Sequence, residues 1–168
     1  MTTTDTTAPL DWELRMQALW TTYDEHDGPR FRELVETLTS ELPADHPIGL
    51  FERGCAHDST GEPVLAAKLY RQALKGGLSE QRRRRAVIQL ASSLRNLGEL
   101  DASASLLTKE RNEASDELDD AVIAFLALTL VDQGRAREAT ALALEALSRH
   151  LPRYSRSLTR YAKALIEA

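Results

Sequence analysis

The stretch from Leu50 to Leu78 constrains the fold of this chain more than any other part. It predicts two amphipathic helices that are separated by a turn at Gly61 and followed by a stop at Gly76-Gly77, because glycine readily ends a helix. The arrangement recurs along the chain. The glycines that end the first helix of each hairpin are Gly28, Gly61, Gly98 and Gly134, at spacings of 33, 37 and 36 residues. Such a period is typical of a helical solenoid, in which each hairpin buries its apolar face against its neighbours.

The apolar periodicity and the residues that end each helix predict an all-α solenoid of about nine helices, built from four hairpins and a C-terminal capping helix. Proline and glycine mark most of the expected boundaries. The predicted parts are a flexible N-terminal tail over 1–9, a divergent hairpin over 10–46, three repeats over 47–151 (47–79, 80–115 and 116–151), and a capping helix over 152–168.

Composition narrows the class of partner. The net charge is -5, which argues against a general attraction to nucleic acid or to anionic lipid. Cys55 is the one cysteine, so neither an intrachain disulfide nor a CxxC zinc site can form. The N-terminus lacks the features of a signal peptide, and no apolar run approaches the ~20 residues of a membrane span. We therefore expect a cytoplasmic protein that binds neither nucleic acid nor membrane.

The central unit resembles the tetratricopeptide repeat. Its residues at the family's pattern positions are Leu50, Gly54, Ala66, Tyr70 and Ala73. The segment IQLASSLRNLGE, from Ile88 to Glu99, is similar to small stand-alone bacterial members of the family. The likeness covers roughly residues 47 to 152. The sequence departs from the pattern at Arg53, His57 and Glu110, where the family has Leu, Tyr and Ala.

The resemblance implies a right-handed superhelix whose first helices line a concave groove. Such proteins bind a peptide or a protein there without catalysis. One subclass grips a C-terminal carboxylate through Lys, Asn and Arg. The matching positions in this chain hold Phe51, Cys55, Gln89, Ala121 and Phe125. The chaperone-tail function of that subclass is therefore not supported.

The predicted groove follows one stripe of each first helix. On the central helix Gln89, Ser92 and Asn96 share the polar side, and Arg85 and Arg95 lie beside it. Arginine and asparagine side chains suit the capture of carboxylates or backbone amides. The alternative for the polar stripe is an ordinary solvated helix face. The alternative for Phe51 and Phe125 is packing against a neighbouring helix, in place of contact with a ligand. The full predicted set is Phe51, Cys55, Asp58, Arg85, Gln89, Ser92, Arg95, Asn96, Phe125, Thr129 and Asp132.

The run from Arg82 to Arg85 is the most concentrated charge in the chain. Four bases at a helix start oppose the helix dipole, which costs roughly 0.3–1 kcal/mol for each exposed charge. A nucleic-acid patch is disfavoured, because no aromatic residues are interleaved and the chain is acidic. We expect pairing with nearby acids, either Glu80 or the cluster from Glu113 to Asp120, or simple solvation.

The sequence contains no residue spacing that is typical of a catalytic site. Cys55 and His57 are two residues apart on a helix, so they point to different sides and cannot form a dyad. The histidines show no metal-binding spacing and there is no phosphate loop, so we expect no cofactor, no metal and no enzyme activity. The competing hypothesis is a self-associating structural protein whose terminal helices build a homodimer, through the capping helix or the face of Trp12 and Trp20.

Overall fold

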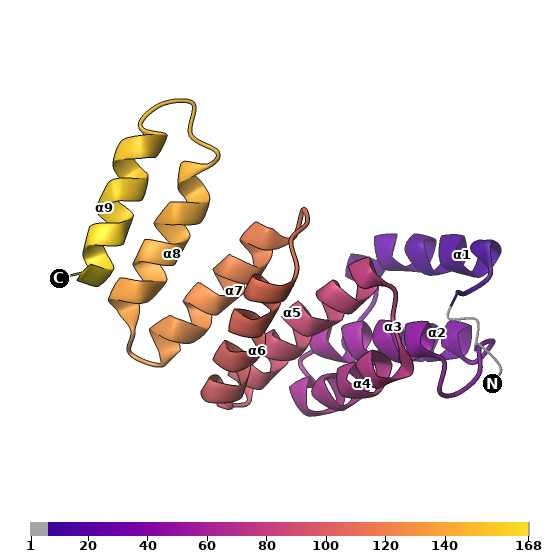
Figure 1. Ribbon diagram of the computed structural model, residues 1–168. Helices are drawn as coiled ribbons and strands as arrows, with labels where there is room; N and C mark the ends of the chain where they lie inside the picture. Colours follow the sequence, from indigo (N-terminus) through magenta and orange to yellow (C-terminus); the bar gives the residue numbers. More distant parts are fainter. Residues whose placement is uncertain (1–6, 168) are drawn as a thin grey trace, which may run out of the picture. The chain divides into compact units, whose positions relative to one another are not determined.

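The computed structural model describes residues 7–167 of the chain, and these residues form helices connected by short turns, with no strand (Figure 1). Residues 1–6 of the predicted tail lie outside this range. The helices are α1 (Leu10–Thr21), a 3-10 turn η1 (Tyr23–Glu25), α2 (Gly28–Thr39), α3 (Pro47–Ser59), α4 (Pro63–Gly76), α5 (Glu80–Asn96), α6 (Leu100–Glu113), α7 (Asp119–Asp132), α8 (Ala136–Ser148) and α9 (Ser155–Glu167).

The predicted all-α repeat fold is confirmed. Residues 7–167 hold nine α-helices, and helices that are consecutive in sequence pack against one another in pairs such as α3 with α4 and α7 with α8. A proline stands in the first turn of α2, α3 and α4. Proline suits that position because the amide that it lacks has no partner in the first turn of a helix.

The chain divides into two compact units, Met1–Ser93 and Leu94–Ala168, and the boundary falls within α5. In the first unit α3 is surrounded, and most of its residues from Pro47 to Ala56 are buried. The core of the second unit is aliphatic, with Leu107, Val122, Ile123, Leu126 and Ala139 among its buried residues. Each unit therefore has a core of its own.

The turn glycines are confirmed at three of the four predicted positions. Gly61, Gly98 and Gly134 have φ of 83°, 79° and 76°, the left-handed conformation that only glycine adopts without strain. The expectation for Gly28 is wrong, because Gly28 begins α2. The carboxylate of Asp27 accepts a hydrogen bond from the backbone N–H of Arg30 at 2.8 Å and so caps that helix. The first hairpin thus has a different turn from the later ones.

Helices α3 and α4 approach closely at Gly54. A Cβ added to this glycine would lie 2.8 Å from Cε1 and 2.9 Å from Cδ1 of Tyr70. The Tyr70 side chain is fully buried, so its ring has no free space to move into. The absence of a side chain at Gly54 is what lets the aromatic ring of α4 lie against the backbone of α3.

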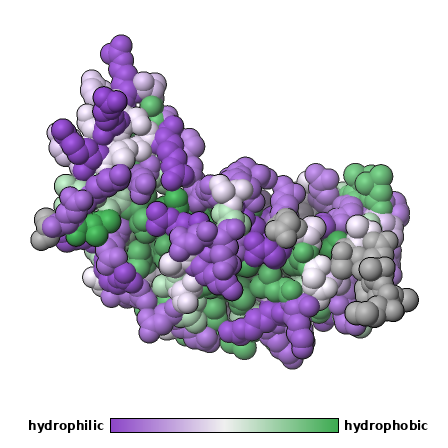
Figure 2. Space-filling model, in the orientation of Figure 1, coloured by the Kyte–Doolittle hydropathy of each residue, from purple (hydrophilic) through white to green (hydrophobic). Residues whose placement is uncertain are grey.

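Figure 2 shows that hydrophilic side chains cover most of one face of the molecule and that apolar side chains are visible in separate patches. Within residues 7–167, every helix is too short or too polar to cross a bilayer.

Gly54→Ala is expected to destabilise the protein by about 1 kcal/mol. Overpacking against the ring costs roughly 1–3 kcal/mol, and the better helix propensity of alanine offsets about 1 kcal/mol of that. Urea unfolding followed by circular dichroism measures the change. Tyr70→Leu supplies the control background, since it removes the ring that the new Cβ meets. An equal cost of Gly54→Ala in both backgrounds would show that the Tyr70 ring is not the cause.

Candidate functional site

Several predicted groove residues of the first unit meet in a polar network between α3, α4 and α5. The Cys55 thiol donates a hydrogen bond to Oε1 of Gln89 at 3.1 Å, and the Tyr70 hydroxyl donates to the same oxygen. The hydroxyl of Ser93 donates to Oδ1 of Asp58 at 3.1 Å. Side chains from α3, α4 and α5 are therefore joined by hydrogen bonds. A hydrogen-bonded network of this kind fixes the relative positions of its helices.

Burial separates these residues into core and surface. Phe51 has no exposed surface, and Cys55 is 6% exposed. The ring of Phe51 lies 6.1 Å from the ring of Tyr70 and 5.1 Å from the guanidinium carbon of Arg85. Phe51 therefore packs inside the unit and carries the exposed Arg85 on its face through a cation–π contact. This corresponds to the packing alternative for Phe51, because α3 is enclosed by its neighbours.

The Cys55 thiol is in an environment that makes it a poor nucleophile. Burial raises its pKa above the ordinary value, and the nearby charge of Glu52 raises it further. The thiol is therefore protonated at neutral pH, whereas a nucleophilic cysteine needs a thiolate. Burial also raises the pKa of the Asp58 carboxyl, while the hydrogen bonds from Ser93 and Tyr70 act in the opposite direction.

A pocket of about 530 Å³ opens between α1, α3 and α5 of the first unit. One side is apolar and comes from α1, where Leu10 and Leu14 are exposed one helical turn apart. The other side is polar. The full lining is Leu10, Glu13, Leu14, Met16, Gln17, Trp20, Glu52, Cys55, Ser59, Arg82, Arg85 and Gln89. Its size and mixed lining are those of a binding site for a small group or a short peptide segment.

The contribution of α1 to this pocket was missed by the sequence reasoning. Nε1 of Trp20 donates a hydrogen bond to Oε2 of Glu52 at 2.8 Å, and Nη2 of Arg82 pairs with Oε2 of Glu13 at 2.5 Å. These contacts hold α1 across α3 and α5. The one available signal was that Glu52 shares a helical stripe with the predicted groove residue Cys55.

Glu52 is an acid inside the pocket wall. It is 6% exposed, and burial raises its pKa against the opposing effects of the Trp20 hydrogen bond and the charge of Arg82. Its second oxygen, Oε1, lies 4.0 Å from Nε of Arg82. That distance is too long for a hydrogen bond, so this oxygen and the buried Nε of Arg82 are left without a hydrogen bond to each other.

The arginine run is divided among different environments. Arg82 pairs with Glu13 of α1, Arg84 is buried with 1% exposure, and Arg85 lies over Phe51. For Arg82 the partner is thus neither of the acidic groups expected from the sequence, because α1 folds back onto α5 and brings Glu13 near. The run does not form a single exposed basic patch.

In the second unit the predicted residues also separate. Nε of Arg95 pairs with Oδ2 of Asp132 at 2.5 Å, while Asn96 is exposed and Phe125 is half-buried. Thr129 is 1% exposed; its hydroxyl donates to the carbonyl of Phe125 at 3.0 Å. Thr129 therefore belongs to the core, and Arg95 already has an acidic partner within the chain. Ser92, in the first unit, is half-buried on α5.

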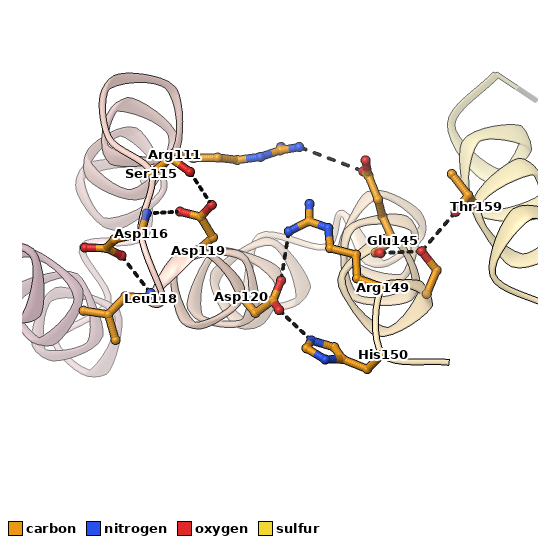
Figure 3. Close-up of polar contacts among 11 residues, drawn as sticks. Arg111, Ser115, Asp116, Leu118, Asp119, Asp120, Glu145, Arg149, His150 and Thr159 are labelled. Carbon is orange, nitrogen blue, oxygen red and sulfur yellow. Dashed lines mark hydrogen bonds and ion pairs between the residues drawn. The ribbon is translucent and has the colours of Figure 1, made fainter. Parts of the chain in front are cut away.

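Polar contacts join the ends of α7, α8 and α9, as Figure 3 shows. Asp120 of α7 accepts from Arg149 at 3.0 Å and lies 2.7 Å from Nε2 of His150. Ser148 and Thr159 share a hydrogen bond of 3.0 Å between α8 and α9. Arg149 and His150 are exposed, so their contacts with Asp120 orient the helix ends more than they add stability. Ser148 is 3% exposed, and its hydrogen bond to Thr159 lies between the packed helices α8 and α9. In the described part of the chain no cluster of His, Cys, Asp and Glu could hold a metal ion.

The comparisons with known proteins agree with this architecture. A family model described as tetratrico peptide repeat matches residues 47–165, from the start of α3 into α9, which is more than half of the chain. No curated protein matches the chain, and no solved structure does.

Glu52→Gln is expected to weaken the pH dependence of stability. Because burial raises the pKa of Glu52, the folded protein binds the proton more tightly than the unfolded chain does. The free energy of unfolding therefore has a component that falls as pH rises from the ordinary value of 4.5 through the raised folded value. Glutamine keeps an oxygen for Trp20 and carries no charge. Urea unfolding across this range should show a smaller fall in the variant.

Glu41→Gln is the matched control, because its pKa shift has the opposite sign. The hydrogen bond from Arg15 lowers the pKa of Glu41, so its contribution is present above the ordinary pKa and is lost as pH falls. Glu41 is exposed, and its effect should be small. The same fall with pH in wild type and in Glu52→Gln would contradict the role assigned to Glu52.

Proposed function

The chain belongs to the tetratricopeptide repeat family, and we propose that it is a non-catalytic adaptor or scaffold that binds a peptide segment of a partner protein. Proteins of this family generally serve as protein-interaction modules. The observation that carries the finer proposal is the pocket between α1, α3 and α5, where exposed leucines face a polar wall that includes Arg85.

The charges around this pocket favour an acidic or carboxylate-bearing segment. Arg82 is paired with Glu13 at 2.5 Å. Arg85 is exposed, and in the described residues no carboxylate lies within ion-pair distance of it. The Phe51 ring beneath holds the guanidinium plane, which leaves its N–H groups for a carboxylate of the partner. Leu10 and Leu14 would contact an apolar side chain of the same segment.

In the first unit, the surface-accessible groove residues Asp58, Gln89 and Ser92 extend the proposed site. In the second unit, taken by itself, the accessible predicted residues are Asn96, Phe125 and the ion pair of Arg95 with Asp132. The buried members, Phe51, Cys55 and Thr129, support these residues from within the core. The raised pKa of the Cys55 thiol supports a role in binding rather than nucleophilic catalysis.

Arg85→Glu is expected to remove the partner while leaving the fold intact, because Arg85 is exposed and its replacement reverses the charge at the pocket. Affinity capture from a lysate of the source organism, read by mass spectrometry, compares wild type with this variant and with Arg95→Glu/Asn96→Ala. We expect the client to fall by about tenfold or more with Arg85→Glu, as for a charge pair at a binding site.

Arg156→Glu is the matched control, since it makes the same change of charge on the exposed side of α9. The client should be retained by this control as by the wild type. Circular dichroism verifies that each variant is helical. Identical protein lists from all variants would contradict groove-dependent binding.

A second candidate function is self-association through the C-terminal hairpin. Large apolar side chains remain exposed there, with Tyr154 at 77%, Tyr161 at 60% and Ile166 at 56% exposure. Exposed apolar side chains that gather on one hairpin are typical of interaction surfaces. The face of Trp12 and Trp20 offers less support, because Trp12 is buried and Trp20 is half-buried.

Tyr161→Glu/Ile166→Glu is expected to convert any homodimer into a monomer, because a buried unpaired carboxylate opposes association. Size-exclusion chromatography with multi-angle light scattering measures the mass at several protein concentrations. Arg85→Glu should leave the mass unchanged. A wild type that stays monomeric at all concentrations would exclude this candidate.

A further inference from the structure

The first unit has a second pocket, of about 750 Å³, between α3, α4 and the loop before α3. It is lined by two rows of helical residues that converge on an apolar floor. The lining residues are Ala44, Asp45, Leu50, Arg53, His57, Leu65, Lys68, Leu69, Gln72, Lys75 and Gly76. None of them lines the pocket described above.

The two pockets use nearly opposite faces of α3. Leu50, Arg53 and His57 line this pocket, whereas the residues two positions further along, Glu52, Cys55 and Ser59, line the other. Residues two positions apart on an α-helix point to different sides, because each residue turns the helix by about 100°. A ligand in this pocket therefore would not compete for the groove residues.

The pocket is locally basic although the chain is acidic. Arg53, Lys68 and Lys75 face it, against the single carboxylate of Asp45. Arg53 is paired with Glu36 at 2.7 Å. No ion pair joins Lys68 or Lys75 to an acidic residue in the described part of the chain, so two cations stand unpaired above the floor. Burial lowers the pKa of His57, which keeps that ring neutral at physiological pH.

The floor is apolar and continuous with an exposed leucine. Leu50 and Leu69 are each 8% exposed, while Leu65 is 44% exposed at the rim. Leu65, Leu69, Lys68 and Lys75 all come from α4, and the two lysines are seven residues apart. Two helical turns separate them, a rise of about 10.5 Å. The pattern is an apolar strip bordered by positive charges at a helical spacing.

We propose that this pocket binds an acidic amphipathic helix of a partner protein, with carboxylates at Lys68 and Lys75 and an apolar side chain on Leu65 and Leu69. Acidic residues seven apart on a helix lying along α4 have the same spacing as the two lysines. The apolar stripe of such a helix is complementary to the leucine floor, which is the helix-in-groove mode of recognition. This site is separate from the groove function and adds a second binding face to the same unit.

The test uses a fluorescein-labelled, alanine-based helical peptide of about 16 residues, with glutamates seven apart and leucines on the same face. Fluorescence anisotropy measures its binding. We expect saturable binding that weakens about tenfold or more with Lys68→Glu/Lys75→Glu, because both unpaired cations are reversed. A peptide with glutamine in place of each glutamate should lose affinity to a similar degree.

Two control variants separate this site from general charge effects and from the groove. Arg156→Glu/Lys163→Glu makes the same total change of charge on α9, and Arg85→Glu alters the other pocket; both should bind the peptide as the wild type does. Equal affinity of the wild type and Lys68→Glu/Lys75→Glu, or no saturable binding, would overturn the proposal. So would complete displacement of the peptide by excess inorganic phosphate, which would indicate an unspecific anion site. Loss of binding in Arg85→Glu alone would place the peptide in the groove and overturn it as well.

Discussion

The close contact between Gly54 and Tyr70 is the constraint on which the first unit depends. Because Gly54 has no side chain, the Tyr70 ring lies directly against the backbone of α3, and its hydroxyl reaches Gln89 of α5. One residue of α4 therefore positions three helices. A close-packed interior transmits such a constraint, since it has no space into which a displaced ring could move. The distance between α3 and α5, and with it the geometry of the pocket, follows from this contact.

Helix α3 is enclosed by its neighbours, and its two sides present different chemical groups to two different pockets. One side presents Glu52 and Cys55 to the pocket under α1, and the other presents Arg53 and His57 to the pocket beside α4. Desolvation raises the pKa of the buried Glu52 and lowers that of the half-buried His57, so on each side the titratable group shifts toward its neutral form. The exposed arginines and lysines then provide the charge available to a partner.

Much of this arrangement could be predicted from local sequence patterns. The apolar periodicity and the glycines at 61, 98 and 134 predicted the hairpins of residues 47–151, because the left-handed turn that ends each first helix requires glycine. The same logic failed at Gly28, where the carboxylate of Asp27 caps the following helix. A glycine that ends a helix and a capping aspartate that begins one are both local features. The short pattern around Gly28 is compatible with either of them.

The site was less predictable than the fold. The helical stripe placed Phe51 and Thr129 beside Arg85 and Asn96, yet the first two are buried and the last two are exposed. A stripe specifies the direction of a side chain on its own helix and carries no information about which neighbour covers it. In the first unit Tyr70 of α4 and Arg85 of α5 lie against Phe51. No sequence pattern linked Glu13 of α1 to Arg82, which is 69 residues away.

The sequence by itself determined the helices, most of their boundaries, the three regular turns and the repeat family, because these depend on interactions between residues that are close along the chain. Only the tertiary structure decided that α1 crosses α3 and α5, that Cys55 is buried and protonated, and that Lys68 and Lys75 border a leucine floor. These features depend on contacts between distant segments. Burial, which sets the pKa of a group and the availability of a charge, is a property of those contacts.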